Sequence, residues 1–137
     1  MAISYHQGRL IDHVHLRVRD LEKSRAFYRA VLDALGRMDT YGEGDGSFYA
    51  DELYVDRASD QPSKVHLAFQ ARSVEQVQRF HRAGLAAGGS DNGAPGRRDY
   101  HPAYYAAFLL DPDGNNIEAV YHGPTERSAE SVVVHRP

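Results

Sequence analysis

Two histidines and one glutamate are the residues of this sequence best suited to hold a metal ion. His13 and His66 each lie at the start of a segment in which polar and apolar residues alternate, and Glu118 follows the turn sequence Asp-Pro-Asp-Gly at 111–114. Two neutral imidazoles and one carboxylate leave coordination positions open for water or substrate, which suits zinc, iron(II), nickel or manganese. The chain contains no cysteine, so thiolate chemistry is excluded. The alternative interpretation is that His13, His66 and Glu118 are three unrelated polar residues.

The two histidines occupy equivalent positions of an internal repeat. A shift of 53 residues aligns 13–36 with 66–89 without a gap, and it pairs Glu22 with Glu75, Phe27 with Phe80 and Gly36 with Gly89. Two amphipathic helices can resemble each other by composition alone, but this does not explain a histidine seven residues before each helix start. The repeat therefore predicts two copies of one structural unit.

Each copy is predicted to begin with a strand and to continue into a helix. Alternating apolar residues at 14–18 and 65–69 are typical of half-buried strands, with each histidine on the face opposite the apolar side chains. The helices are expected to begin after the N-caps Asp20 and Ser73 and to end at Gly36 and Gly89. The buried stripe of the first helix is expected at Leu21, Tyr28, Val31, Leu32 and Leu35.

Short strands are predicted after each helix, at about 48–50 and 53–56 in the first half and at 104–110 and 116–122 in the second. Strand, helix and several strands, repeated once, predict an α+β fold with the helices on one face of an antiparallel or mixed sheet. The other face is then free to line a cavity. Residues 93–105 are too rich in glycine and proline for regular structure, so we expect a loop there.

The overall composition is typical of a globular cytoplasmic protein. The 137 residues are 42% hydrophobic and 26% charged, with a net charge of -3. No long block of one charge favours nucleic acid or an anionic membrane surface as a partner. The apolar runs are shorter than the ~20 residues that span a bilayer, and the first eight residues lack the apolar stretch of a signal peptide.

The sequence resembles the vicinal-oxygen-chelate superfamily of glyoxalases, bleomycin-resistance proteins and extradiol dioxygenases. The resemblance covers about half of the chain and lies in IDHVHLRVRDLEKSRAFYRAVLDALG, KVHLAFQARSVEQVQRFHRAGLAAGG and AAFLLDPDGNNIEAVYH. It implies two βαβββ modules, at about 8–60 and 64–123, within a single domain of 1–123 and followed by a polar tail at 124–137. The sheets would curve into a half-open barrel with the helices on the outer face. The resemblance also suggests a homodimer.

The same resemblance implies a divalent metal held by the first and last strands of each module. His13, His66 and Glu118 would occupy three of the four ligand positions. The fourth falls on the segment 52–56, where pairing Leu53 with Ile117 puts Tyr54 opposite Glu118 and leaves Glu52 on the same face. Here the sequence departs from members of the superfamily that have four ligands.

The leading functional hypothesis is a glyoxalase-like lyase or isomerase that acts on a small oxygen-rich metabolite. The catalytic base would be Glu118, Glu52 or His15, which lies two residues beyond His13 on the same strand face. An iron-dependent ring-cleaving dioxygenase assisted by His15 or Tyr54 is an alternative. A metal-free small-molecule binding protein of the bleomycin-resistance type is another.

The segment 93–105 is the candidate substrate-contacting loop, and a structural or dimer-contact loop is the alternative. Loops often carry binding residues, and this one contains Arg97, Arg98, Tyr104 and His101. Either arginine would suit a carboxylate or a phosphate. The remaining histidines are assigned to surface or packing positions: His6, His81, His122 and His135.

Overall fold

The strand–helix–three-strand order predicted for each copy occurs twice in the computed structural model, which describes residues 4–137. This confirms an α+β fold built from two βαβββ modules. The elements in chain order are β1 (Val14–Val18), α1 (Leu21–Ala34), β2 (Gly42–Gly44), β3 (Ser47–Ala50), β4 (Leu53–Arg57), β5 (His66–Gln70), α2 (Val74–Ala86), β6 (Ser90–Arg97), β7 (Tyr105–Leu110) and β8 (Asn116–Tyr121).

The strands form two four-stranded mixed sheets. Sheet A has the order β1-β4-β3-β2, and sheet B has the equivalent order β5-β8-β7-β6. In each sheet the first strand pairs in parallel with the last strand of its module, in the register Val14↔Leu53 and Leu67↔Ile117. The two registers are equivalent, so Tyr54 of sheet A stands at the position that Glu118 occupies in sheet B. The sheets do not close into a barrel.

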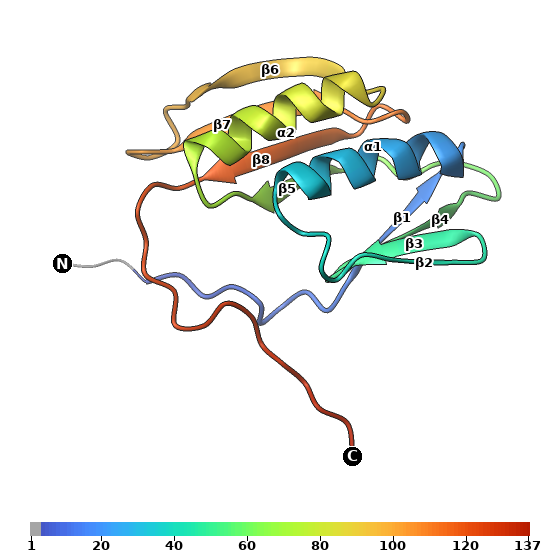
Figure 1. The fold of residues 1–137 in the computed structure, drawn as a ribbon, viewed down its shortest axis with the longest axis horizontal. Coiled ribbons are helices and arrows are strands. Elements are labelled where there is room, and N and C mark those ends of the chain that lie inside the picture. The colour runs from blue at the N-terminus through green and yellow to red at the C-terminus, as the bar shows by residue number, and fades with distance from the viewer. Residues whose placement is uncertain (1–3) are drawn as a thin grey trace.

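The two helices lie side by side, and α2 lies across sheet B (Figure 1). Asp20 and Ser73 cap them as predicted, each side chain accepting a hydrogen bond from a backbone N–H three residues on. Helix α1 packs on sheet A, where the rings of Tyr28 and Phe48 lie 6.0 Å apart. At Gly84, helix α2 packs tightly against both β7 and α1, because a Cβ there would overlap Leu109 Cδ1 and lie 3.0 Å from Val31 Cγ1. The predicted stripe of α1 is buried in a core that both modules share.

The turn at 111–114 joins the modules as well as joining β7 to β8. The buried Asp111 accepts hydrogen bonds from the backbone N–H groups of Asp113 and Asn115, and also from the hydroxyl of Tyr28 on α1 at 2.6 Å. The backbone carbonyl of Asp113 accepts a bond from Lys64 Nζ at 3.1 Å. Because α1 and this turn belong to different modules, the Tyr28–Asp111 bond helps to fix how the modules pack.

Three local predictions were wrong. Residues 90–97 form β6, although glycine and proline argued against regular structure from 93 onward. This strand lies at the edge of sheet B, where Pro95 and two register shifts against β7 are tolerated. Strand β2 was also missed. The left-handed residue that ends α2 was predicted at Gly89. It is instead Gly88, with φ 102°, whereas Gly89 packs against Phe27.

The C-terminal residues 124–137 form neither a helix nor a strand. Within 4–137, neither helix has the length and apolar character needed to cross a bilayer.

Candidate functional site

Side-chain alternation places His66 and Glu118 on one face of sheet B. Leu67 pairs with Ile117, and both side chains pack in the shared core on the helix side. Their neighbours His66 and Glu118 therefore project from the opposite face. We call the sheet faces turned away from α1 and α2 the open faces. The open face of sheet B also carries a small apolar cluster of Ala106, Phe108, Val120 and Tyr104.

The His66 imidazole and the Glu118 carboxylate are in direct contact. Nε2 of His66 lies 2.8 Å from Oε1 of Glu118, and the hydroxyl of Tyr104 donates a hydrogen bond to Oε2 at 2.5 Å. The carboxylate is 3% exposed, whereas the imidazole is 54% exposed. A buried carboxylate requires such partners, because burial without them costs several kcal/mol. The sheet thus holds one carboxylate in place while leaving the imidazole accessible.

Tyr104 remains a hydrogen-bond donor over the whole neutral range. Burial raises the pKa of the Tyr104 hydroxyl, and the hydrogen bond to Glu118 and the negative charge of that residue raise it further. The phenol therefore keeps its proton and can orient the carboxylate. Tyr104 was predicted to contact substrate, and the structure places it directly on Glu118.

His101 and His122 form a second pair beside Tyr104. Their rings are stacked with centroids 5.0 Å apart, and Nε2 of His101 lies 2.8 Å from Nδ1 of His122. The other ring nitrogen of His101 lies 2.7 Å from the carbonyl oxygen of Pro102, which can only accept, so that nitrogen carries a proton. Burial and the neighbouring His101 lower the pKa of His122. Sequence reasoning missed this pair, although His122 continues the alternation of Glu118 and Val120.

Phe108 connects this polar cluster to the predicted loop. Its ring lies 6.1 Å from the His66 ring, and the Arg98 guanidinium carbon lies 5.3 Å from its centroid. Arg98 and Tyr104 line a recess of about 340 Å³, to which Arg97 also contributes. Of the three predicted substrate-contacting residues, Tyr104 thus contacts Glu118 directly and Arg98 lies over Phe108, whereas Arg97 borders both this recess and the pocket on the helix side. The apolar role of Phe108 could have been found from its alternation with Tyr104 and Ala106.

The open face of sheet A carries a different polar cluster. His15 Nε2 lies 2.7 Å from Asp56 Oδ1, and the His15 ring meets the Tyr54 ring edge-on at 5.1 Å. Two of the predicted catalytic residues, His15 and Tyr54, are thus in contact. Asp56, which the sequence analysis did not select, bonds His15. Glu52 is exposed just before β4, where its carbonyl accepts a bond from the backbone of Val14.

His13 lies just before β1, apart from the other two predicted metal ligands. Its Nδ1 lies 2.6 Å from Oδ1 of Asp12, and its side chain is 65% exposed. Within 4–137, no three histidine, aspartate or glutamate side chains are grouped closely enough to hold a metal. One chain thus brings His66 and Glu118 together, while His13 remains in the other module.

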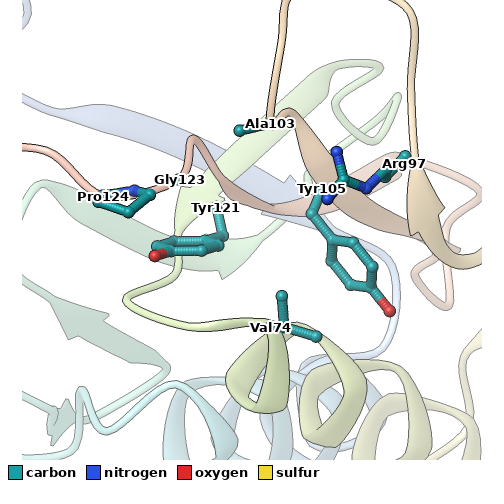
Figure 2. Close-up of a pocket in the computed structure, with 7 residues that line it drawn as sticks. All are labelled: Val74, Arg97, Ala103, Tyr105, Tyr121, Gly123 and Pro124. Carbon is teal, nitrogen blue, oxygen red and sulfur yellow. The ribbon is translucent and has the colours of Figure 1, made fainter.

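A smaller pocket of about 140 Å³ lies on the helix side of sheet B. Figure 2 shows Tyr105 and Tyr121 facing Val74 across this pocket, with Arg97 at one side. The alternation along β7 and β8 puts this pocket on the face opposite Glu118. It is therefore separate from the polar cluster of the open face.

Comparisons with known proteins agree with this architecture. The family model described as Glyoxalase/Bleomycin resistance protein/Dioxygenase superfamily matches residues 10–119. A solved glyoxalase/bleomycin resistance protein from Albidiferax ferrireducens is 35% identical, with 81% of this chain and 97% of that chain covered and a TM-score of 0.68. A solved glyoxalase-related enzyme from Fulvimarina pelagi shares the fold at 18% identity, with 94% and 99% of the two chains covered and a TM-score of 0.66.

No curated protein matches the chain. The family match nevertheless spans both modules, from the segment before β1 to the strand that carries Glu118, and the repeated sheet topology accompanies it. This chain therefore belongs to the glyoxalase/bleomycin resistance protein/dioxygenase superfamily.

Proposed function

We propose that this chain is a metal-dependent enzyme acting on a small oxygen-rich metabolite, with a glyoxalase-like lyase or isomerase reaction as the leading candidate. The observation that supports this most strongly is the contact between the accessible imidazole of His66 and the buried carboxylate of Glu118. Family membership favours a small-molecule substrate. We expect the protein to act in the cytoplasm.

The donor set of this cluster fits a divalent metal. One imidazole nitrogen and one carboxylate oxygen lie 2.8 Å apart, and zinc, iron, nickel and manganese all accept this combination. Tyr104 bonds the other carboxylate oxygen, as partners of metal ligands commonly do, and so limits rotation of Glu118. A bound metal would act as a Lewis acid that polarises substrate oxygens.

The third proposed ligand, His13, is best supplied by a second copy of the chain. Within 4–137, His13 does not join His66 and Glu118. Its side chain is nevertheless largely exposed, as is the His66 imidazole. A two-fold dimer that brings module one of one subunit to module two of its partner would form two equivalent sites. This arrangement explains why the chain has all three ligands but groups only two of them.

In such a dimer, the open face of module one would supply the proton acceptor. His15 is held by Asp56 at 2.7 Å and lies against Tyr54, so its ring has a defined orientation. If His15 Nε2 donates to Asp56, the other nitrogen is free to accept a proton from substrate. Glu52, exposed just before β4, is the second candidate base.

The test is metal binding by the His66→Ala variant. Purified without chelator and reconstituted with zinc, iron(II), nickel or manganese, the natural sequence should hold a stoichiometric ion, whereas His66→Ala should lose tight binding and stay folded. The variant should remain folded because the imidazole is mostly exposed. His135→Ala, in the C-terminal segment, is the matched control and should bind normally. Stoichiometric metal in His66→Ala would remove this site from consideration.

An iron-dependent ring-cleaving dioxygenase is the second candidate. Two histidines and one carboxylate are also the ligand set of non-haem iron oxygenases, and His15 and Tyr54 would then assist the reaction. The two proposals differ in the metal that supports turnover. Oxygen consumption with a catechol, only in the iron-loaded protein, would favour the dioxygenase. A folded natural protein that binds none of the four metals would favour a metal-free binding protein.

A further inference from the structure

Arg98 has a defined position on the open face of sheet B. Its Nη2 donates to the carbonyl of Ala94 at 2.8 Å and its Nη1 to the carbonyl of Arg97 at 3.3 Å. The guanidinium lies over the ring of Phe108, which adds a cation–π attraction. The backbone N–H of Arg98 is also bonded, to the carbonyl of Tyr104 at 3.0 Å. The side chain is therefore held by two carbonyls and an aromatic ring rather than extended into solvent.

Two glycines leave the space that the guanidinium occupies. A Cβ at Gly93 would lie 3.3 Å from Nη2 of Arg98, and a Cβ at Gly96 would lie 3.2 Å from Nη1. Both distances are shorter than ordinary carbon contacts. The composition of β6, which argued against a strand, thus allows the arginine to fold back over its own segment.

The positive charge of Arg98 lacks a carboxylate partner within the part of the chain that the structure describes. The ion pairs found there involve Arg25, Arg29 and Arg72 but not Arg98. A guanidinium has five N–H donors, and the two carbonyl contacts leave others unused. A half-buried cation with unused donors at the wall of a 340 Å³ recess is suited to bind an oxyanion.

The recess lies beside the proposed metal ligands. Phe108 lies between Arg98 and His66, within 5.3 Å of the guanidinium carbon and 6.1 Å of the imidazole centroid. Tyr104 lines the same recess and bonds Glu118. A molecule long enough to cross the Phe108 ring could therefore contact the guanidinium at one end and the His66–Glu118 cluster at the other.

We propose that Arg98 is the anion-recognition residue of this site and that the natural substrate carries a carboxylate or phosphate group in addition to the oxygens presented to the metal. The claim that the substrate also presents oxygens to a metal rests on the proposed function. The apolar ring of Phe108 then packs against the carbon skeleton between the two ends. An uncharged catechol or aldehyde alone leaves the guanidinium without a partner.

The experiment measures anion binding in the absence of metal. Chelator-treated, ¹⁵N-labelled protein is titrated with sodium phosphate and, separately, with sodium acetate at constant ionic strength, while the arginine Nε–H and backbone amide signals are followed by NMR. We expect at least one anion to shift the Arg98 Nε–H signal and the amides of Gly93 and Gly96 saturably. Saturation by phosphate alone identifies a phosphate-bearing substrate, and saturation by acetate alone identifies a carboxylate.

Two variants of equal net charge test the assignment. Arg98→Lys retains the charge but loses the planar fork, so binding of the anion should weaken at least tenfold. Arg82→Lys on the exposed side of α2 should bind as the natural sequence does. The proposal is overturned if neither anion gives a saturable shift, or if Arg98→Lys binds with unchanged affinity. Because the protein is metal-free in this experiment, its result is independent of the His66→Ala test.

Discussion

The His66 imidazole and the Glu118 carboxylate meet across two parallel strands, although 52 residues separate them in the chain. The strand register pairs Glu118 with Ala68. Glu118 therefore contacts His66 diagonally, because His66 lies two residues before Ala68 on the same face. In module one the equivalent positions hold His13 and Tyr54. There Tyr54 instead contacts His15, which bonds Asp56. Two copies of one unit have thus acquired different polar clusters on equivalent faces.

A mixing experiment can show whether two subunits share the metal site. His13→Ala and His66→Ala should each fail to bind metal tightly when pure. After subunit exchange, half of the dimers are mixed and each mixed dimer keeps one intact site, so about one quarter of all sites should bind metal. Metal analysis of the mixture against the two separate variants gives the answer. No recovery in a mixture shown to contain mixed dimers would place the site within one chain.

Tyr104→Phe should weaken metal binding without removing a ligand. The change deletes the hydroxyl that donates to Glu118 at 2.5 Å and leaves one oxygen of a buried carboxylate unpaired. Loss of such a supporting bond typically lowers metal affinity about 10–100-fold. Competition with a chelator of known affinity measures the change. Tyr100→Phe, whose ring touches Tyr104 but is 69% exposed, is the control and should bind metal normally.

Tyr28→Phe should change how stability depends on pH. Burial and the adjacent Asp111 raise the pKa of Tyr28 well above that of a free tyrosine. The unfolded chain therefore loses this proton first, above pH ~10, and the free energy of unfolding falls as pH rises further. Below pH ~10 the hydroxyl is protonated in both states and its bond to Asp111 is fully stabilising.

The variant should be less stable at pH 7 by about 1–3 kcal/mol, because Asp111 loses a buried donor. Its stability should also fall less steeply than that of the natural sequence above pH 10. Urea unfolding at a series of pH values measures both effects. Parallel curves for the two proteins above pH 10 would contradict the assignment to Tyr28.

Gly84→Ala should destabilise the protein although alanine is the better helix former. The helix gain is about 1 kcal/mol, but the new methyl group would overlap the fully buried Leu109 and crowd Val31. Overpacking of a tight core costs about 1–3 kcal/mol, so the net effect should be a loss of stability. Thermal unfolding would show a lower Tm. Arg82→Ala, exposed on the same helix, should change stability by less than about 0.5 kcal/mol.

Much of the fold follows from local chemistry that is visible in the sequence. The alternation around Leu16 and Leu67 predicts strands because side chains of an extended chain point to opposite faces. Asp20 and Ser73 predict the helix starts because their side chains satisfy free backbone N–H groups. The repeat extends these local rules from 13–36 to 66–89. The pairing of Leu53 with Ile117, which the family resemblance implied, correctly makes Tyr54 equivalent to Glu118.

Tertiary structure decided which polar residues meet, since those contacts depend on strand register and on how the modules pack. Alternation places Asp56 and His122 on the open faces, but only the pairing of β1 with β4 brings Asp56 to His15, and only the fold of the loop between β6 and β7 brings His101 to His122. Residues 90–97 have a low intrinsic propensity for a strand. They form one nevertheless, because β7 supplies hydrogen-bonding partners for their backbone. The position of His13 apart from Glu118 likewise results from module packing, which local spacing along the chain does not encode.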